Sequence, residues 1–196
     1  MARINARNGT EITDSPVAKF IFSDTRMAWA WLILRVYIAY TWISAGFEKL
    51  TGTGWIDGGA SLKGFWTSAI KVNPKPVITF DWYRAFIQFM LDSGAYVWFA
   101  KLVVAGELLI GIALLLGAFT GIAAFFGSFM NWNFMMAGST SVNPVLFTLS
   151  ILLILAWKTA GYLGLDRYLL PMLGTPWKPG FMAPARTPVT GPSMAE

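Results

Sequence analysis

Residues 96–116 read YVWFAKLVVAGELLIGIALLL, an apolar stretch in which Glu107 is the single acidic residue. A helix needs roughly 20 predominantly apolar residues to cross a bilayer, and this stretch has that length. Further apolar runs of similar length lie at residues 27–47, 119–136 and 144–160. A single soluble core cannot bury four separate runs of this kind. The sequence therefore predicts an all-α fold, an integral membrane four-helix bundle.

The composition indicates a membrane protein and argues against several other classes. Of the 196 residues, 56% are hydrophobic and 13% are charged, whereas about a quarter of a soluble domain is charged. The net charge of +5 is scattered along the chain, so we expect no nucleic-acid partner. The chain has no cysteine and no histidine, so no haem or metal is expected to be ligated by these residue types. Any redox chemistry must therefore rely on a partner or on a bound organic cofactor.

The connections between the predicted spans differ in length. Residues 117–118 and 138–143 are short turns, which place the helices that they join antiparallel. The connection between the first and second spans is much longer and contains two stretches with helical spacing of apolar residues, at 61–71 and 81–92. We expect both to be interfacial amphipathic helices that form a lid on one end of the bundle. The membrane-facing side predicted for the second of them consists of Trp82, Phe86, Phe89 and Met90.

The chain is expected to have three parts. Residues 1–26 form an N-terminal tail, residues 27–162 form the four-span membrane domain, and residues 163–196 form an interfacial segment with a Pro-rich C-terminal tail. Residues 1–26 lack the early apolar core and the cleavage site of a signal peptide. The side of the membrane that carries both termini has more lysines and arginines than the other side, and such an excess is typical of the cytoplasmic side. We therefore predict a multi-pass protein with both termini in the cytoplasm.

Two charged residues fall inside the predicted spans. At 1.5 Å per residue, Arg35 lies about 12 Å and Glu107 about 15 Å from the cytoplasmic ends of their helices. A lone charge at this depth costs at least about 3 kcal/mol. The matching depths predict an ion pair between the first and second spans. Three interpretations of the two charges stay open. A pair fixes only the packing of the helices, a pair handles protons or binds a ligand, with Glu107 as the candidate catalytic residue, or each charge has a separate partner.

Polar and aromatic residues on the first and third spans add a candidate cofactor site. Asn131 and Asn133 lie near the level of Glu107, and because residues two apart point to different sides of a helix, at most one of them is expected to face it. They flank Trp132, and Trp42 is one of several aromatic residues in the first span. Such rings can sandwich a quinone head group, although they more often form packing surfaces and interfacial belts. The candidate cofactor-binding residues are Arg35, Trp42, Asn131, Trp132 and Asn133, and no metal site is predicted.

A series of short motifs follows along the chain. They are Gly46-Phe-Glu-Lys-Leu50, Gly58-Gly-Ala-Ser-Leu-Lys-Gly-Phe-Trp66, Asp81-Trp-Tyr-Arg84, Gly106-Glu-Leu-Leu-Ile-Gly111 and Gly164-Leu-Asp-Arg-Tyr-Leu-Leu-Pro171. In this order they resemble the DoxX/DoxD family, over about residues 20–178 of the chain. The resemblance supports Glu107 and the Glu48-Lys49 pair as the polar positions of interest.

The resemblance also implies a cellular location and a function. Members of the family are small four-span membrane proteins of bacteria and archaea, so the chain is expected in a prokaryotic cell (inner) membrane, in contact with the lipid bilayer. The DoxD branch is the membrane subunit of a thiosulfate:quinone oxidoreductase and pairs with a smaller DoxA subunit. The implied cofactor is a quinone, and the implied partners are other subunits of a membrane complex, including a DoxA-like one.

Two functions remain open on the sequence. The first is a membrane subunit of a quinone-linked oxidoreductase or electron-transfer complex. The second is a non-catalytic accessory structural subunit of a larger respiratory or photosynthetic assembly, which the lack of Cys and His favours because sulfur chemistry usually relies on a thiolate or a metal.

Overall fold

A computed structural model describes all residues except 1–2, 6–8, 12–13, 73 and 176–196. The described chain is predominantly helical, as the sequence predicted. The exception is a short antiparallel hairpin of β1 (Arg3–Asn5) and β2 (Gly9–Glu11) within the predicted N-terminal tail. The predicted C-terminal tail beyond Thr175 lies outside the described residues.

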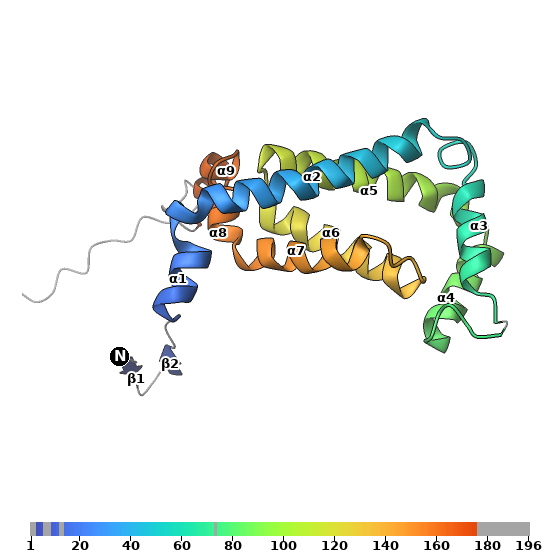
Figure 1. The fold of residues 1–196 in the computed structure, drawn as a ribbon, viewed down its shortest axis with the longest axis horizontal. Helices are drawn as coiled ribbons and strands as arrows, with labels where there is room; N and C mark the ends of the chain where they lie inside the picture. The colour runs from blue at the N-terminus through green and yellow to red at the C-terminus, as the bar shows by residue number, and fades with distance from the viewer. Residues whose placement is uncertain (1–2, 6–8, 12–13, 73, 176–196) are drawn as a thin grey trace, which may run out of the picture.

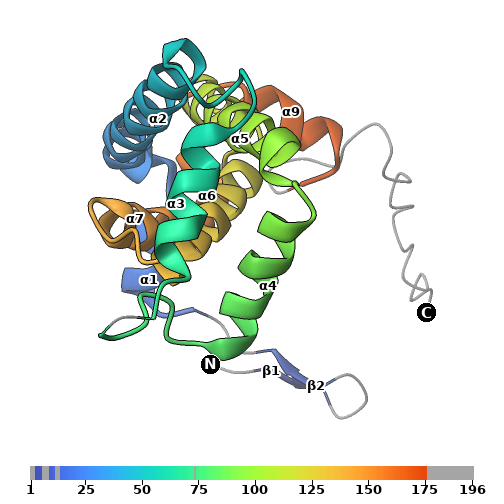
Figure 2. The same cartoon turned by 90° about the vertical axis from the view of Figure 1, so that its right-hand side faces the viewer.

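The molecule is organised around four long helices that run side by side. They are α2 (Ala28–Thr51), α5 (Tyr96–Leu116), α6 (Thr120–Met136) and α7 (Asn143–Leu155). Figure 1 shows these helices along the long axis of the molecule, and Figure 2 shows them grouped when viewed from one end. The most extensive packing joins α2 with α5 and α6 with α7, and α5 with α6 and α2 with α7 complete the bundle.

Two of the described helical stretches have the length and hydropathy needed to cross a membrane, Thr25–Thr51 and Tyr96–Leu116. Asn143–Leu155 is apolar but shorter. This helix ends at Ala156, and the chain continues as α8 (Trp157–Ala160). The fourth apolar stretch, residues 144–160, therefore forms two helices that are separated by a break at Ala156.

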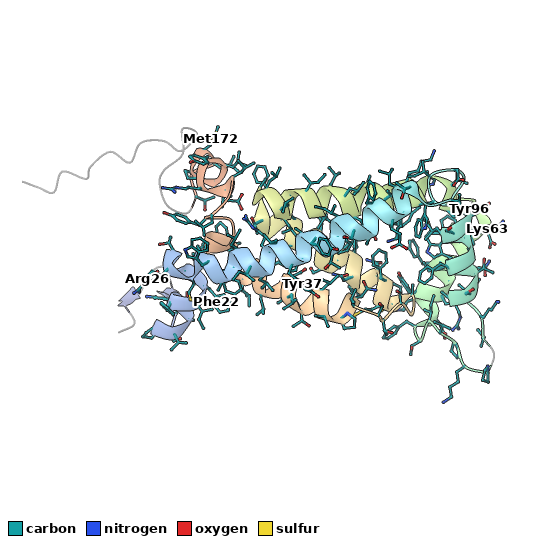
Figure 3. The ribbon with its side chains drawn as sticks, turned by 45° about the horizontal axis from the view of Figure 1, so that its top comes forward. Phe22, Arg26, Tyr37, Lys63, Tyr96 and Met172 are labelled. Carbon is teal, nitrogen blue, oxygen red and sulfur yellow. The ribbon has the colours of Figure 1, made fainter. Side chains whose placement is uncertain are left out.

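Shorter helices cover the two ends of the bundle. At one end lie α3 (Ala60–Ala69) and α4 (Asp81–Asp92), both steeply inclined to the bundle axis (Figure 1). At the other end lie α1 (Pro16–Ser23), the 3-10 turn η1 (Thr25–Met27), α8 and α9 (Asp166–Met172). Figure 3 shows this division, with Lys63 and Tyr96 at the first end and Phe22, Arg26 and Met172 at the second.

One residue of α4 packs differently from the prediction. Tyr83, Ile87 and Met90 are buried against α3 and the start of α5, while Trp82, Phe86 and Phe89 are exposed. Of the predicted membrane-facing set, Met90 therefore belongs to the core. The helix has apolar residues on more than one side, and periodicity alone could not tell which side contacts protein.

Two clusters of buried residues form the core. The larger lies among the four long helices and includes Ile38, Trp42, Leu114 and Leu153. The smaller joins α3, α4 and the beginning of α5 around Trp66, Ile78 and Tyr83. Because the second cluster is continuous with α5, α3 and α4 are packed elements of the fold rather than free loops.

Candidate functional site

Glu107, the acidic residue in the middle of α5, is paired with a lysine. Lys49 Nζ lies 2.9 Å from Glu107 Oε2. The Glu107 side chain is 2% exposed and that of Lys49 is 22% exposed, so the pair links the interior of the bundle to its surface. The Lys49 ammonium also lies over the ring of Trp55, 5.3 Å from its centroid, where a cation is attracted to the π-face.

The sequence around Lys49 explains how the pair forms. Gly46 lies against α5, where a Cβ would come within 2.9 Å of Leu108 and 3.2 Å of Glu107. The absence of a side chain at this position lets α2 and α5 approach closely. Side chains of a helix lean toward its N-terminus. In this antiparallel pair Lys49 and Glu107 therefore lean toward each other, and the lysine can reach the carboxylate.

The predicted ion pair between Arg35 and Glu107 is wrong. Both residues are only 1% exposed, but the Arg35 Nη2 donates to the Leu163 carbonyl oxygen at 2.9 Å. The guanidinium packs against Gly117 and Gly164, at the end of the bundle opposite to Lys49. Arg35 and Glu107 lie at different levels of the bundle, because a Cβ at Gly46, eleven residues after Arg35 on α2, would contact Glu107; the two positions are thus about 16 Å apart along the helix axis. The equal depths expected from helical rise assumed a different register of α2 against α5.

A buried aspartate lies beside Arg35. Asp166 is fully buried and accepts hydrogen bonds from the backbone N–H of Phe119 at 2.5 Å and of Thr120 at 2.8 Å. It thus satisfies free donors at the start of α6, where a negative charge is also favoured by the helix dipole. It interacts electrostatically with Arg35 as well. Arg35 and Asp166 therefore fasten the C-terminal segment to the α5–α6 turn.

Several polar atoms at the centre of the bundle have no hydrogen-bond partner within the described part of the chain. They are Trp42 Nε1, Ser150 Oγ, and both Nδ2 and Oδ1 of Asn131. Asn131 and Ser150 are fully buried, and Trp42 is 3% exposed. Buried polar groups are normally hydrogen-bonded, and leaving one unsatisfied costs about 1–3 kcal/mol. These atoms therefore retain hydrogen-bonding capacity that no other described residue uses.

These atoms come from helices that meet at similar depth. A Cβ at Gly127 would lie 3.3 Å from both Ile110 Cγ2 and Trp42 Nε1, which places α2, α5 and α6 together there. Asn131 follows one turn later on α6, and a Cβ at Gly106 would lie 3.1 Å from Met130. Asn131 lies five residues before the end of α6 and Ser150 seven residues after the start of the antiparallel α7, so these two residues lie at similar levels. The unpaired polar atoms thus lie within about one helical turn of the level of Glu107.

The remaining candidate residues, Trp132 and Asn133, do not face this centre with Asn131. Trp132 is exposed. Asn133 Nδ2 donates to the Phe129 carbonyl oxygen, and the Tyr83 hydroxyl lies 3.3 Å from Asn133 Oδ1 and 3.1 Å from its carbonyl oxygen. Asn133 therefore connects α6 to α4, and only one of the two asparagines is at the centre, as the spacing predicted.

Sequence reasoning missed the roles of Ser150 and Asp166. Ser150 is a single small polar residue in an apolar helix, and such residues are common where helices pack. Asp166 was visible only as part of the Gly164–Pro171 motif. An acidic residue just after the last predicted span, with an arginine inside the first span, is the signal that could have suggested their association.

One family model matches the chain. The DoxX model matches residues 30–140, which is just over half of the chain and extends from α2 to the end of α6. The match includes Lys49, Glu107, Trp42 and Asn131. Neither the curated proteins nor the solved structures contain a match to the chain.

Proposed function

Because the chain belongs to the DoxX family, whose members are membrane-associated, we propose that it is the membrane subunit of a quinone-linked oxidoreductase, with thiosulfate as the candidate electron donor. The observation that supports this proposal is the set of unpaired polar atoms of Trp42, Asn131 and Ser150 near Glu107. A quinone head group has two carbonyl oxygens, which can accept hydrogen bonds from the indole N–H and from the asparagine amide.

Reduction of a quinone to a quinol consumes two electrons and two protons. The chain has no Cys or His, so the electrons are assigned to a partner subunit, for which a DoxA-like protein is the candidate. The protons are assigned to the Lys49–Glu107 pair, because Glu107 is a buried carboxylate whose partner Lys49 is partly exposed. Glu48 is exposed beside Lys49 and interacts electrostatically with Glu107, which provides a second carboxylate toward the surface.

The proposed arrangement in the membrane has four spans. Helices α2 and α5 have the length and hydropathy needed to cross the bilayer. Helix α6 and the α7–α8 pair cross with them, because they pack against α2 and α5 in the same bundle. Both termini then lie on the cytoplasmic side of a prokaryotic cell membrane, and α3 and α4 lie on the outer side.

The cysteine-free chain suits a labelling test of this topology. A cysteine replacing Lys19 should react only from the cytoplasmic side and one replacing Lys71 only from the other, and reaction of both from one side would contradict four spans.

Activity tests the function directly. The chain is purified together with its co-expressed partner subunits, and thiosulfate-dependent reduction of a short-chain benzoquinone is measured. The Glu107→Gln variant should lose at least about tenfold in turnover, because general acid–base catalysis contributes about 10²–10⁴-fold. The exposed Glu48→Gln variant is the control for a nearby change of charge and should lose less. Unchanged turnover in Glu107→Gln would contradict the proton-handling role.

An accessory structural subunit is the second candidate. The observation that favours it is the number of large aromatic residues exposed on the outside of the bundle, among them Trp29, Tyr40, Phe125 and Phe129. Aromatic residues are enriched both at protein interfaces and in membrane belts. A complex that keeps its full turnover with both Glu107→Gln and Asn131→Leu, but fails to assemble without the chain, would favour this function.

A further inference from the structure

A groove opens on the side of the bundle at the end where α9 lies. Its volume is about 340 Å³, and it is formed by the start of α6, the end of α7, the break before α8, and α9. Its wall is mainly apolar and includes Ile122, Ile154, Trp157, Leu170 and Leu173. Ile122 and Leu173 are more than half exposed, so the groove is open to whatever surrounds the bundle at this level.

One polar side chain at this groove has no partner among the described residues. Thr120 lines the groove and is fully buried, and its hydroxyl oxygen makes no hydrogen bond to any of them. Its backbone N–H is already taken by Asp166, which also lines the groove. The carboxylate of Asp166 is occupied by two backbone N–H groups. The groove thus offers an apolar wall with one free hydroxyl donor.

We propose that this groove binds one acyl chain of a membrane glycerophospholipid, with the ester carbonyl oxygen accepting a hydrogen bond from the Thr120 hydroxyl. An acyl ester combines a long apolar chain with one uncharged acceptor, which matches the wall and the free donor. The hydrogen bond would satisfy a buried hydroxyl that otherwise costs free energy. The site is independent of the proposed quinone site, since Thr120 is at the first turn of α6 and Asn131 is about three turns further along.

The position of the groove favours a phospholipid over other occupants. It lies at the end of the bundle, where ester groups are found at the boundary between head groups and acyl chains. Trp157, which lines it, belongs to the residue type enriched at that boundary. The Nζ of Lys158 lies 6.0 Å from the ring centroid of Trp157, which lines the groove. This cation suits the phosphate of a head group beside the groove.

Lipid binding by the purified full-length protein tests this proposal. Native mass spectrometry with added dioleoylphosphatidylglycerol counts the tightly bound lipids and measures their affinity. Leu173→Trp places a larger side chain in the groove, and we expect the variant to lose one bound lipid. The matched control is Leu102→Trp on α5, because Leu102 and Leu173 are both 55% exposed, and this variant should keep it.

Thr120→Val removes the hydroxyl but keeps the shape of the side chain, so it tests the hydrogen bond even if the tryptophan variant does not fold. The lipid should bind about three- to tenfold more weakly, whereas Thr148→Val, which alters a hydroxyl already bonded within α7, should have no effect. Equal binding by Leu173→Trp and Leu102→Trp, or an unchanged affinity in Thr120→Val, would overturn the proposal. Stoichiometric displacement of the phospholipid by a short-chain benzoquinone would assign the groove to a quinone and overturn it as well.

Discussion

At the scale of single residues, the direction in which helical side chains lean decides which charges meet. Lys49 and Glu107 lie on antiparallel helices at positions from which their side chains converge, and they form an ion pair at 2.9 Å. Arg35 lies fourteen residues before Lys49 on α2, at the other end of the bundle, and bonds to the Leu163 carbonyl oxygen. Each buried charge therefore finds a polar partner at its own end of the bundle.

This assignment predicts the outcome of a double-mutant cycle. Lys49→Met leaves the carboxylate of Glu107 without its partner and should lower the free energy of unfolding by about 3 kcal/mol, near the low end for a buried pair because Lys49 is 22% exposed. Adding Glu107→Gln should recover at least about 1 kcal/mol of this loss. The free energies are measured by titration with a denaturing detergent. Arg35→Met with Glu107→Gln is the control cycle, and a coupling there above about 0.5 kcal/mol would contradict the assignment.

A pH effect is expected at Tyr83, which lies outside the proposed spans. Burial raises the pKa of Tyr83 to about 12 from the ordinary value of 10.0. Between these values the unfolded chain loses a proton that the folded protein keeps, so stability should fall as the pH rises, by up to about 1.4 kcal/mol per pH unit. Tyr83→Phe should flatten this part of the curve and leave the slope below pH 10 unchanged. An equally steep fall in the variant would contradict the assignment.

At the scale of elements, close contact between α2 and α5 holds the Lys49–Glu107 pair together. A Cβ at Gly111 would come within 2.6 Å of Ile43 Cγ1 and 2.9 Å of its backbone nitrogen. Gly111→Ala should therefore push the helices apart and cost about 1–3 kcal/mol in the free energy of unfolding. Gly64, on α3, has nothing within 4 Å of such a Cβ, so Gly64→Ala should be neutral or stabilising by up to about 1 kcal/mol. Similar losses in the two variants would contradict tight packing at Gly111.

The helices could be predicted from the sequence better than their contacts. The apolar runs at 96–116 and 119–136 coincide almost residue for residue with α5 and α6, because the glycine at 117 and the length of each run mark the ends. The buried face of α4 could not be predicted, since this helix has apolar residues on several sides. The break at Ala156 leaves no mark in composition, because Leu155, Ala156 and Trp157 are all apolar.

The candidate site was predicted only in part. Glu107 and Asn131 could be chosen because polar residues are conspicuous in an apolar helix. Lys49 could not be identified as the partner of Glu107 from the depths expected along each helix, because the pairing depends on the register of α2 against α5, which places Gly46 against Glu107, and on the lean of both side chains. Asp166 and Ser150 needed the tertiary structure, which brings the C-terminal segment to the α5–α6 turn and α7 to the centre.

At the scale of the whole molecule, the bundle has unpaired polar atoms at its centre and many exposed aromatic residues on its outside. The centre holds Trp42, Asn131 and Ser150 with unpaired atoms, close in level to Glu107. Helices α3 and α4 cover the end of the bundle on the Lys49 side (Figure 1). The proposed function needs such an arrangement, since a quinone from the bilayer must meet both hydrogen-bond donors and a source of protons.

Quinone binding to variants of the two asparagines tests this account most directly. Dissociation constants of a short-chain benzoquinone are measured for the purified protein by quenching of tryptophan fluorescence. Asn131→Leu removes polar atoms that have no partner, so it should not destabilise the protein, yet it should weaken binding by about tenfold, the equivalent of one hydrogen bond. Asn133→Leu, which alters a residue already bonded to α4, should leave binding within about threefold of the wild type. A folded Asn131→Leu variant that binds the quinone as tightly as the wild type would contradict the account.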